Sequence, residues 1–357
     1  MNVLIIGGSN SQMKAGYASL LPDLLPVADI VNLSVGAAPS HMGVFRLLTY
    51  PRLSQVDHVV WEYALNDVNH VKSKGYSEDS LLKFAEHTLK ICARRRIRLI
   101  PVLLTPLSEE GSPYSSYRSK LHFLFSHYGV EFCDISHLAR RRFGTRVLDR
   151  SFFKDPNHYD PSGPMPQLIA AKVAEMIQGG GGDVQNAAPM FIEKRTVARV
   201  TRQFEDSSQE IFQNSLLKYA VFDPADPIKL TFSSSGTLTG MVVVAGPGGG
   251  AVDVLLNDEV QFTLSMVHDE PRFNKPLLKI IVFGSILNRD LHYREGDRLE
   301  IRWSQAPSAA ICDMGFSFVE EGLRGDRGRI VGLLSEELFA AEPKPAEQHV
   351  RMASVPQ

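Results

Sequence analysis

The first half of the chain alternates short apolar runs with amphipathic stretches of helical period. The apolar runs predict strands at Val3–Ile6, Ile30–Leu33, His58–Glu62, Arg98–Leu104 and Glu131–Asp134. The amphipathic stretches predict helices at Met13–Leu21, Gly43–Leu48, Ser80–Arg95, Tyr114–His127 and Gly163–Ile177. Apolar strands separated by helices are typical of a parallel sheet covered on both faces. Residues 1–178 are therefore expected to form a three-layer, doubly wound α/β domain.

Four consecutive glycines, at 179–182, interrupt this pattern and a different one follows. Glycine runs are unfavourable inside helices and strands, so residues 179–189 are predicted to be a flexible linker. Over 190–335, strands without long helices between them indicate an antiparallel, jelly-roll-like β-sandwich. These strands are predicted at Lys229–Ser233, Thr237–Ala245, Val252–Leu256, Glu259–Met266, Leu277–Phe283, Arg298–Ser304 and Met314–Val319. Residues 336–357, rich in Ala, Pro, Glu and Lys, are expected to be a disordered tail.

Composition and charge narrow the class of protein. The 357 residues are 44% hydrophobic and 22% charged, with a formal net charge of −2, so neither nucleic acid nor an anionic membrane is indicated as a partner. No apolar run reaches the roughly 18 residues of a membrane span, and the apolar start lacks a basic n-region. The three cysteines, Cys92, Cys133 and Cys312, are far apart and are interpreted as buried thiols. A cytoplasmic location is expected, and the oligomeric state is left open.

Four short motifs follow the predicted strands or precede the last helix. The first is Gly7-Gly8-Ser9-Asn10-Ser11, after the first strand; the second is Gly36; the third is Ala64-Leu65-Asn66-Asp67; the fourth is Asp155-Pro156-Asn157-His158. Each motif alone is weak, because such residues are common in turns. Together they fall where strands of one α/β domain end, which is where such folds bind their ligands.

In this order, Ser9, Gly36, Asn66 and His158 resemble the SGNH (GDSL-like) hydrolase superfamily, whose domain is a flavodoxin-like three-layer fold. Gly7-Gly8-Ser9 resembles its Gly-Asp-Ser block, Ala64-Leu65-Asn66-Asp67 its Gly-x-Asn-Asp block, and Asp155-x-x-His158 its terminal block. The resemblance covers about residues 1–178. Gly8 replaces the usual acidic residue and Ala64 the usual glycine, which puts the substrate subtype in question.

The resemblance implies a serine-dependent mechanism. Ser9 is the expected nucleophile, His158 its base, and Asp155 the residue that orients the imidazole. The Ser9 N–H, the Gly36 N–H and the Asn66 side-chain amide are the expected oxyanion donors. No metal and no bound cofactor are expected.

Other polar residues near these motifs have competing interpretations. Ser11 is a rival nucleophile, but a local hydrogen bond is the preferred interpretation. His41 and His70 are candidates for lining the pocket, although solvated loop histidines are the simpler expectation. Glu62 is expected near the site or inside the sheet and is assigned no role.

Some sequence features are interpreted as structural. Arg94-Arg95-Arg96 and Arg140-Arg141-Arg142 are expected at helix C-termini, where cations complement the helix dipole. His268-Asp269-Glu270 is expected to be a surface turn rather than a metal site. Gly246-Pro-Gly-Gly-Gly250 is expected to be a sandwich loop, because it lacks the Lys-Ser/Thr of a phosphate loop. Asn257-Asp258 is expected to form a tight hairpin turn.

These observations favour an esterase that removes short acyl groups, such as acetyl, from a carbohydrate or polysaccharide through an acyl-Ser9 intermediate. One alternative is a polysaccharide O-acetyltransferase that uses the same triad with acetyl-CoA as co-substrate. A non-catalytic glycan-binding or assembly protein is a second alternative. A lipase or thioesterase is less favoured, because no long apolar insertion interrupts the first domain. The β-sandwich is associated with glycan enzymes only by architectural analogy.

Overall fold

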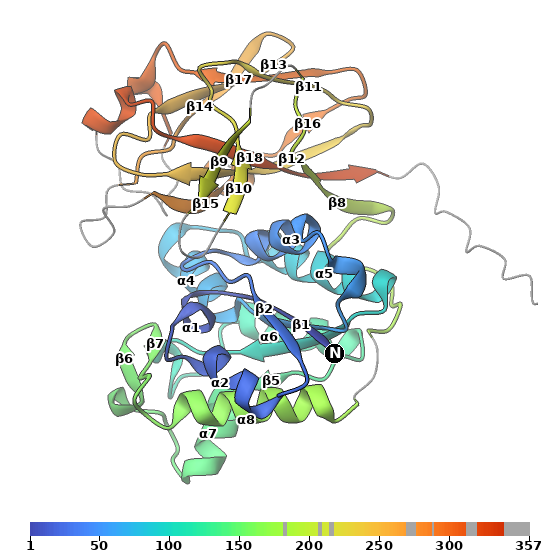
Figure 1. Ribbon diagram of the computed structural model, residues 1–357, viewed down its shortest axis with the longest axis vertical. Helices are drawn as coiled ribbons and strands as arrows, with labels where there is room; N and C mark the ends of the chain where they lie inside the picture. Colours follow the sequence, from blue (N-terminus) through green and yellow to red (C-terminus); the bar gives the residue numbers. More distant parts are fainter. Residues whose placement is uncertain are drawn as a thin grey trace, which may run out of the picture.

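The computed structural model describes residues 1–180, 184–205, 209–213, 218–268, 276–287, 289–311 and 320–338. An α/β part lies below and a β-sandwich above in Figure 1. Cys312, the predicted strand Met314–Val319 and residues 339–357 of the predicted tail lie outside these ranges. The predicted fold class is confirmed, a parallel α/β sheet followed by antiparallel sheets packed as a sandwich.

The α/β part is built on a five-stranded sheet of order β2-β1-β3-β4-β5, in which every pairing is parallel. Alternate residues of β1 enter different cores, Leu4 and Ile6 on one face and Val3 and Ile5 on the other. Helices α3, α5 and α6 cover the first face, and α2, α7 and α8 cover the second. The strands are β1 (Asn2–Gly7), β2 (Asp29–Asn32), β3 (His58–Glu62), β4 (Arg98–Leu103) and β5 (Cys133–Asp134). The helices are α1 (Ser9–Gln12), α2 (Tyr17–Leu24), α3 (Ser40–Thr49), α4 (Ala64–Lys74), α5 (Glu78–Arg95), α6 (Ser116–His127), α7 (Ile135–Phe143) and α8 (Met165–Gln178).

The helices of this part differ from the sequence prediction in three places. The single helix predicted at Met13–Leu21 is replaced by α1 and α2, so Ser9 itself begins a helix. Helix α4 was missed because its buried face is partly polar and includes Asn66, Asp67 and His70, so it has no apolar stripe. Helix α7 was not among the predicted helices, but the expectation that Arg140-Arg141-Arg142 lies at a helix C-terminus is confirmed, because these arginines are in its last turn.

The second part is a sandwich of two antiparallel sheets with a small two-stranded sheet beside it. One sheet has the order β11-β17-β13-β14, and the other has the order β15-β12-β18-β8 with β16 also paired to β12. Their facing sides form one apolar core that includes Met241, Val254 and Ile301. The strands are β8 (Thr196–Thr201), β9 (Glu210–Gln213), β10 (Lys218–Val221), β11 (Ile228–Thr231), β12 (Gly236–Ala245), β13 (Ala251–Leu256), β14 (Glu259–Ser265), β15 (Leu277–Val282), β16 (Leu291–Tyr293), β17 (Arg298–Trp303) and β18 (Arg329–Leu338), with the short helix α9 (Phe283–Leu287).

Several local predictions for the sandwich can be compared with these elements. The Asn257-Asp258 turn between β13 and β14 is confirmed, with left-handed φ values of 52° and 68° at its two residues. Strands β8, β9, β10, β16 and β18 were not predicted. The predicted tail begins too early, because β18 continues to Leu338 and buries Glu336. The prediction that His268 lies in a surface turn is wrong, since its side chain is only 4% exposed; Asp269 and Glu270 lie outside the described residues.

The sandwich packs directly on the helices of the α/β part. The outer face of sheet β15-β12-β18-β8 and helices α3 and α5 contribute to one continuous core. Phe45 of α3 and Val242 of β12 are both 0% exposed within it. A polar contact crosses the same boundary, where the buried Glu336 carboxylate accepts hydrogen bonds from Lys83 and from Nε2 of His87. The two parts are therefore joined by both apolar and charged contacts.

The chain between the two parts is anchored on α5 by Glu86. Its carboxylate oxygens accept from the backbone N–H groups of Met190, Phe191 and Ile192, each at 2.7 Å, and from the Tyr128 hydroxyl at 2.6 Å. Residues 184–189, the end of the predicted linker, lie beside this anchor, where the Gln185 N–H donates to the Tyr128 carbonyl. Glu86 therefore fixes where the second part begins.

Glu86→Gln is expected to lower the free energy of unfolding by about 2 kcal/mol. Both carboxylate oxygens accept two hydrogen bonds, so either orientation of a glutamine places its NH₂ against donors in a buried site. Chemical denaturation followed by circular dichroism measures this change. Glu193→Gln, at an exposed position nearby, is the matched control. Equal unfolding free energies for the two variants would contradict the anchoring role.

Candidate active site

Ser9, His158 and Asp155 form a continuous hydrogen-bonded chain at the carboxyl edge of the parallel sheet. Ser9 is the first residue of α1, directly after β1, and His158 begins β7 (His158–Tyr159), which pairs with β6 (Phe153–Asp155). The Ser9 Oγ lies 2.7 Å from His158 Nε2. His158 Nδ1 lies 2.8 Å from both Asp155 oxygens. With Nδ1–H donating to Asp155, Nε2 is left free to accept the Ser9 hydroxyl proton.

Asp155 is suited to orient the imidazole as a carboxylate. Partial burial raises its pKa, but the Asn157 N–H, the His158 hydrogen bond and the charge of His158 outweigh burial, so the pKa lies below its usual value. The turn is stabilised by Asp155 itself, because its Oδ1 accepts from the Asn157 N–H at 2.9 Å. Asp155 thus shapes the loop that it shares with His158.

The three expected oxyanion donors lie around Ser9. The Ser9 N–H belongs to the first turn of α1, where backbone donors have no intrahelical acceptor. Gly36 is so close that a Cβ on it would lie 3.6 Å from the Ser9 Cβ. The Asn66 amide donates one proton to the Ala38 carbonyl at 2.9 Å, which leaves its second Nδ2–H for a substrate oxygen. All three groups can therefore surround an oxygen at the Ser9 side chain.

Gly8 explains how the Asn66 amide reaches this position. A Cβ on Gly8 would lie 2.4 Å from Asn66 Nδ2, far inside van der Waals contact. Any side chain here would displace the amide from its place beside Ser9. The replacement of the usual acidic residue by Gly8 is thus coupled to the position of Asn66.

The loop that carries Gly36 is held in a strained form. Ala37 has a left-handed φ of 53°, which is unfavourable for a residue with a Cβ. The next carbonyl, that of Ala38, accepts the Asn66 hydrogen bond. The Asn66 amide therefore has two roles: one N–H fixes the Gly36 loop, and the other is the expected oxyanion donor.

Asn10 joins the nucleophile turn to the histidine loop, which sequence reasoning missed. Its Nδ2 donates to the Asn157 carbonyl at 2.9 Å, and its Oδ1 accepts from the Tyr159 N–H at 3.2 Å. These two backbone groups flank His158 in the chain. Asn69 adds a weaker, more exposed contact to the Asn157 side chain at 3.0 Å. Asn10 thus positions His158 without touching it.

Asn10→Ala is expected to lower kcat for a simple ester by about 10- to 100-fold with little change in KM, because small displacements of a catalytic base are costly. Asn69→Ala, which removes only the outer contact, is the matched control and should change kcat less than about threefold. Steady-state kinetics with p-nitrophenyl acetate measures both, and thermal unfolding reports any loss of fold. Equal effects in the two variants would exclude a positioning role for Asn10.

Glu62 lies buried beneath the nucleophile turn. Its Oε2 accepts from the Gly8 N–H at 3.1 Å and from the Ser11 Oγ at 2.8 Å, and Ser11 Oγ is 2.7 Å from the Tyr17 hydroxyl. Ser11 Oγ therefore bonds Glu62 of β3 and Tyr17 of α2, 51 and 6 residues away, so the expected local hydrogen bond is replaced by contacts with other elements. Burial raises the pKa of Glu62 to about 7, against partial compensation by Ser11 and Gly8. The Glu62 carboxyl therefore stabilises the nucleophile turn through Gly8 and Ser11.

In the unfolded chain Glu62 has its ordinary pKa of 4.5 and loses its proton above that pH. In the folded protein its pKa is raised, so the carboxyl keeps the proton up to a higher pH. Glu62 therefore lowers stability progressively as pH rises from about 4.5 to about 7, by on the order of 3 kcal/mol. Glu62→Gln should remove this pH dependence. Between pH 4.5 and pH 7 the unfolding free energy of the variant should therefore rise relative to that of the wild type. Denaturation at pH 5 and pH 7.5 measures the difference. A wild type and variant with the same pH dependence would contradict the assignment.

His41 and His70 are neither pocket-lining groups nor solvated loop residues. His41 is 0% exposed and stacks on Phe84, and burial lowers its pKa well below the usual value. His70 lies in α4, where Nδ1 bonds the Asn66 carbonyl at 2.7 Å, and burial lowers its pKa to about 3. Both expectations for these histidines were wrong, because helices α3 and α4 turn the residues into the core. His70 still contacts the residue that carries the expected oxyanion donor.

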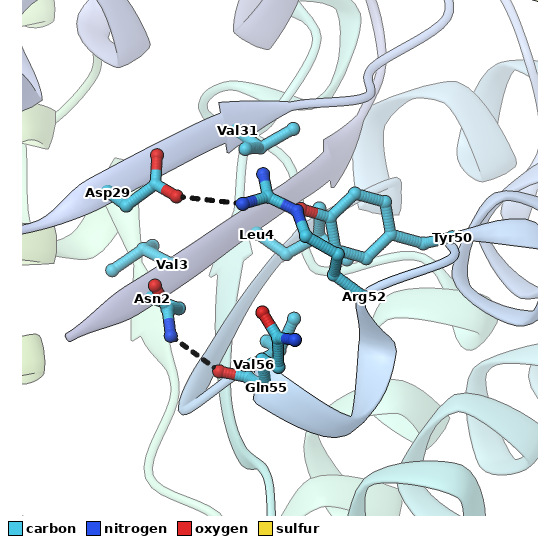
Figure 2. Close-up of a pocket in the computed structure, with 9 residues that line it drawn as sticks. All are labelled: Asn2, Val3, Leu4, Asp29, Val31, Tyr50, Arg52, Gln55 and Val56. Atoms are coloured by element: carbon cyan, nitrogen blue, oxygen red, sulfur yellow. Dashed lines mark hydrogen bonds and ion pairs between the residues drawn. The ribbon is translucent and has the colours of Figure 1, made fainter.

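A separate small cavity lies at the opposite, amino end of the sheet. Figure 2 shows it between the starts of β1 and β2, with the Arg52–Asp29 ion pair at its mouth. Its volume of about 10 Å³ is enough for a single water molecule. This cavity is therefore a packing feature of the sheet.

No group of three or more His, Cys, Asp or Glu side chains in the described part is placed to hold a metal ion. Among the same residues, none of the helices combines the length and the apolar character needed to cross a bilayer.

The chain thus combines a parallel α/β domain, a Ser-His-Asp hydrogen-bonded chain at the carboxyl edge of its sheet and a β-sandwich packed on its helices. The structure resembles a two-domain esterase, CEX, that is active on acetylated mannans and was crystallised with mannopentaose; the TM-score is 0.59 at 13% identity, over 96% of this chain and 92% of that one. The same esterase in another crystal structure gives a TM-score of 0.58 with the same identity and coverage. No protein-family model and no curated protein matches the sequence. The likeness therefore concerns the fold of both domains.

Proposed function

We propose that the protein is a serine-dependent esterase that removes short acyl groups, acetyl in particular, from a carbohydrate through an acyl-Ser9 intermediate. The observation that carries this proposal is the unbroken chain from Ser9 Oγ through His158 to Asp155, with bonds of 2.7 and 2.8 Å. The fold similarity to an esterase active on acetylated mannans supports a carbohydrate ester as substrate.

The chemistry follows from the geometry of the three residues. His158 Nε2 takes the proton as Ser9 Oγ attacks the ester carbonyl, and Asp155 stabilises the imidazolium that forms. The Ser9 N–H, the Gly36 N–H and the Asn66 amide bind the tetrahedral oxyanion. Collapse breaks the ester C–O bond, and His158 gives the proton to the leaving sugar alkoxide. Water, deprotonated by His158, then attacks the acyl carbon; the C–Oγ bond to Ser9 breaks, His158 returns the proton to Ser9 Oγ, and acetate leaves.

Release of acetate from acetylated oligosaccharides tests this proposal. Purified protein is incubated with acetylated manno- and xylo-oligosaccharides, and acetate and deacetylated sugar are measured by mass spectrometry. We expect one acetate for each ester lost, with no release by Ser9→Ala. A parallel reaction contains acetyl-CoA and unacetylated sugar. Acetyl transfer there, without hydrolysis of acetylated sugar, would overturn the hydrolase in favour of an acetyltransferase.

A further inference from the structure

A groove of about 690 Å³ lies at one end of the sandwich, away from the Ser9 turn. It forms where β17 ends at Trp303 and two turns meet, one after β17 and the other just before β18. In Figure 1 these turns, coloured orange to red, lie at the upper left, on the same side of the view as α1, β6 and β7. Its volume lies within the range of small-ligand sites, about 300–1,000 Å³.

The floor and wall of the groove are apolar and firmly built. Trp303 is half-buried at the end of the core-facing row of β17, and Leu323 and Ala251, both nearly buried, lie beside it. Gly250, with a φ of 78°, lets the indole pack against the backbone, because a Cβ there would lie 2.5 Å from Trp303 Cζ3. The Gly250 N–H donates to the Gly322 carbonyl at 3.0 Å, which ties the loop before β13 to the turn before β18. The aromatic wall is therefore formed before any ligand arrives.

The rim of the groove is polar and exposed. Gln305, Arg324 and Asp326 are exposed, and none has a side-chain hydrogen bond or ion pair within the described ranges. Arg324 supplies donors, Asp326 supplies acceptors and Gln305 supplies both. One positive and one negative charge balance, so the rim favours neither a phosphate nor a cation.

We propose that this groove binds a neutral oligosaccharide. A pyranose ring has an apolar C–H face, which matches the exposed part of an indole, and an equatorial belt of hydroxyls that both donate and accept. Trp303 supplies the flat apolar surface, and Gln305, Arg324 and Asp326 supply hydrogen-bond partners for the hydroxyls. A planar aromatic ligand would leave the rim unpaired, and an anionic ligand would meet Asp326.

The proposed sugar site is separate from the ester chemistry. None of its lining residues belongs to the Ser9 turn, the Gly36 loop, α4 or the His158 hairpin. The site holds a glycan chain whether or not Ser9 cleaves an ester on it. Loss of binding and loss of hydrolysis can therefore be measured independently.

Titration of full-length Ser9→Ala protein with unacetylated mannopentaose, xylopentaose and cellopentaose tests the groove. The chain has two tryptophans. Because Trp61 is only 1% exposed in the α/β core, Trp303 is the expected source of any fluorescence change on binding. We expect saturable binding of at least one pentasaccharide by calorimetry, with a matching change in fluorescence. Arg324→Ala should weaken it by about tenfold, equivalent to one charged hydrogen bond. Trp303→Phe should remove the fluorescence change.

Arg327→Ala is the matched control, since Arg327 is exposed on the same turn and does not line the groove. It should bind as tightly as the parent. Binding unaffected by both Arg324→Ala and Gln305→Ala would place the sugar elsewhere and overturn the proposal, as would no binding of any pentasaccharide at millimolar concentration. Tighter binding of ATP than of sugars would assign the groove to anions instead. In the chain that retains Ser9, Arg327→Ala should also turn over p-nitrophenyl acetate at the wild-type rate.

Discussion

Ser9→Ala is expected to lower kcat for ester hydrolysis by about 10⁴- to 10⁶-fold, to the level left by binding and oxyanion donors alone. Ser9 Oγ is the atom within 2.7 Å of His158 Nε2, and no acyl intermediate forms without it. His158→Ala should cost about as much, and the double variant should be no worse than either single variant, because the two residues act as a unit. Release of p-nitrophenol from p-nitrophenyl acetate measures all three.

Ser11→Ala is the control for this result. Ser11 is two residues away and 1% exposed, and it bonds Glu62 rather than His158. Its removal should cost stability and leave hydrolysis within about tenfold of the wild type. If Ser11→Ala abolishes hydrolysis while Ser9→Ala retains it, the nucleophile has been assigned to the wrong serine.

Asn66→Ala is expected to lower kcat by about 10²- to 10³-fold, the usual cost of losing one oxyanion donor. The effect should fall on kcat more than on KM, because the second Nδ2–H is used when negative charge develops on the carbonyl oxygen. A phosphonate ester that mimics the oxyanion should bind more weakly in proportion. Kinetics and inhibition with the same series of esters measure both quantities.

Gly8→Ala tests whether the Asn66 amide must occupy its present position, because this variant keeps the amide but moves it. This variant keeps Asn66 but places a Cβ only 2.4 Å from its Nδ2, which forces the amide to move, so it should also lower kcat. A normal kcat in Asn66→Ala would remove Asn66 from the oxyanion site. A normal kcat in Gly8→Ala alone would show only that the amide can shift without harm.

Ser9, Asp155 and His158 were predicted together from the order of their motifs, and the structure places their side chains in one hydrogen-bonded chain. Ser9 follows β1, which ends at the carboxyl edge of the parallel sheet, as expected for a ligand-binding residue of such a fold, whereas His158 lies in the separate β6–β7 hairpin before α8. The contacts of Asn10 could not be predicted in the same way. They join its side chain to the Asn157 and Tyr159 backbone, 147 and 149 residues away, and no local pattern encodes such a bond.

The packing of the sandwich on α3 and α5 is indicated by the sequence of β12, although it was not among the predictions. Strand β12 contains the uninterrupted apolar run Met241–Ala245, and all five residues are buried. A strand with one solvent-facing side alternates apolar and polar residues, so this run indicates burial on both faces. Helix α4 had no comparable signal, because Asn66, Asp67 and His70 are buried through hydrogen bonds rather than apolar contacts.

Labelling with a fluorophosphonate tests the central claim, that His158 activates Ser9. Wild-type protein is treated with the reagent, digested and mapped by mass spectrometry, beside Ser9→Ala and His158→Ala. One adduct per chain on Ser9, absent from Ser9→Ala and strongly slowed in His158→Ala, is the predicted result. No adduct, or an adduct on Ser11 that persists in both variants, would contradict the triad and favour a protein that binds glycans without cleaving an ester.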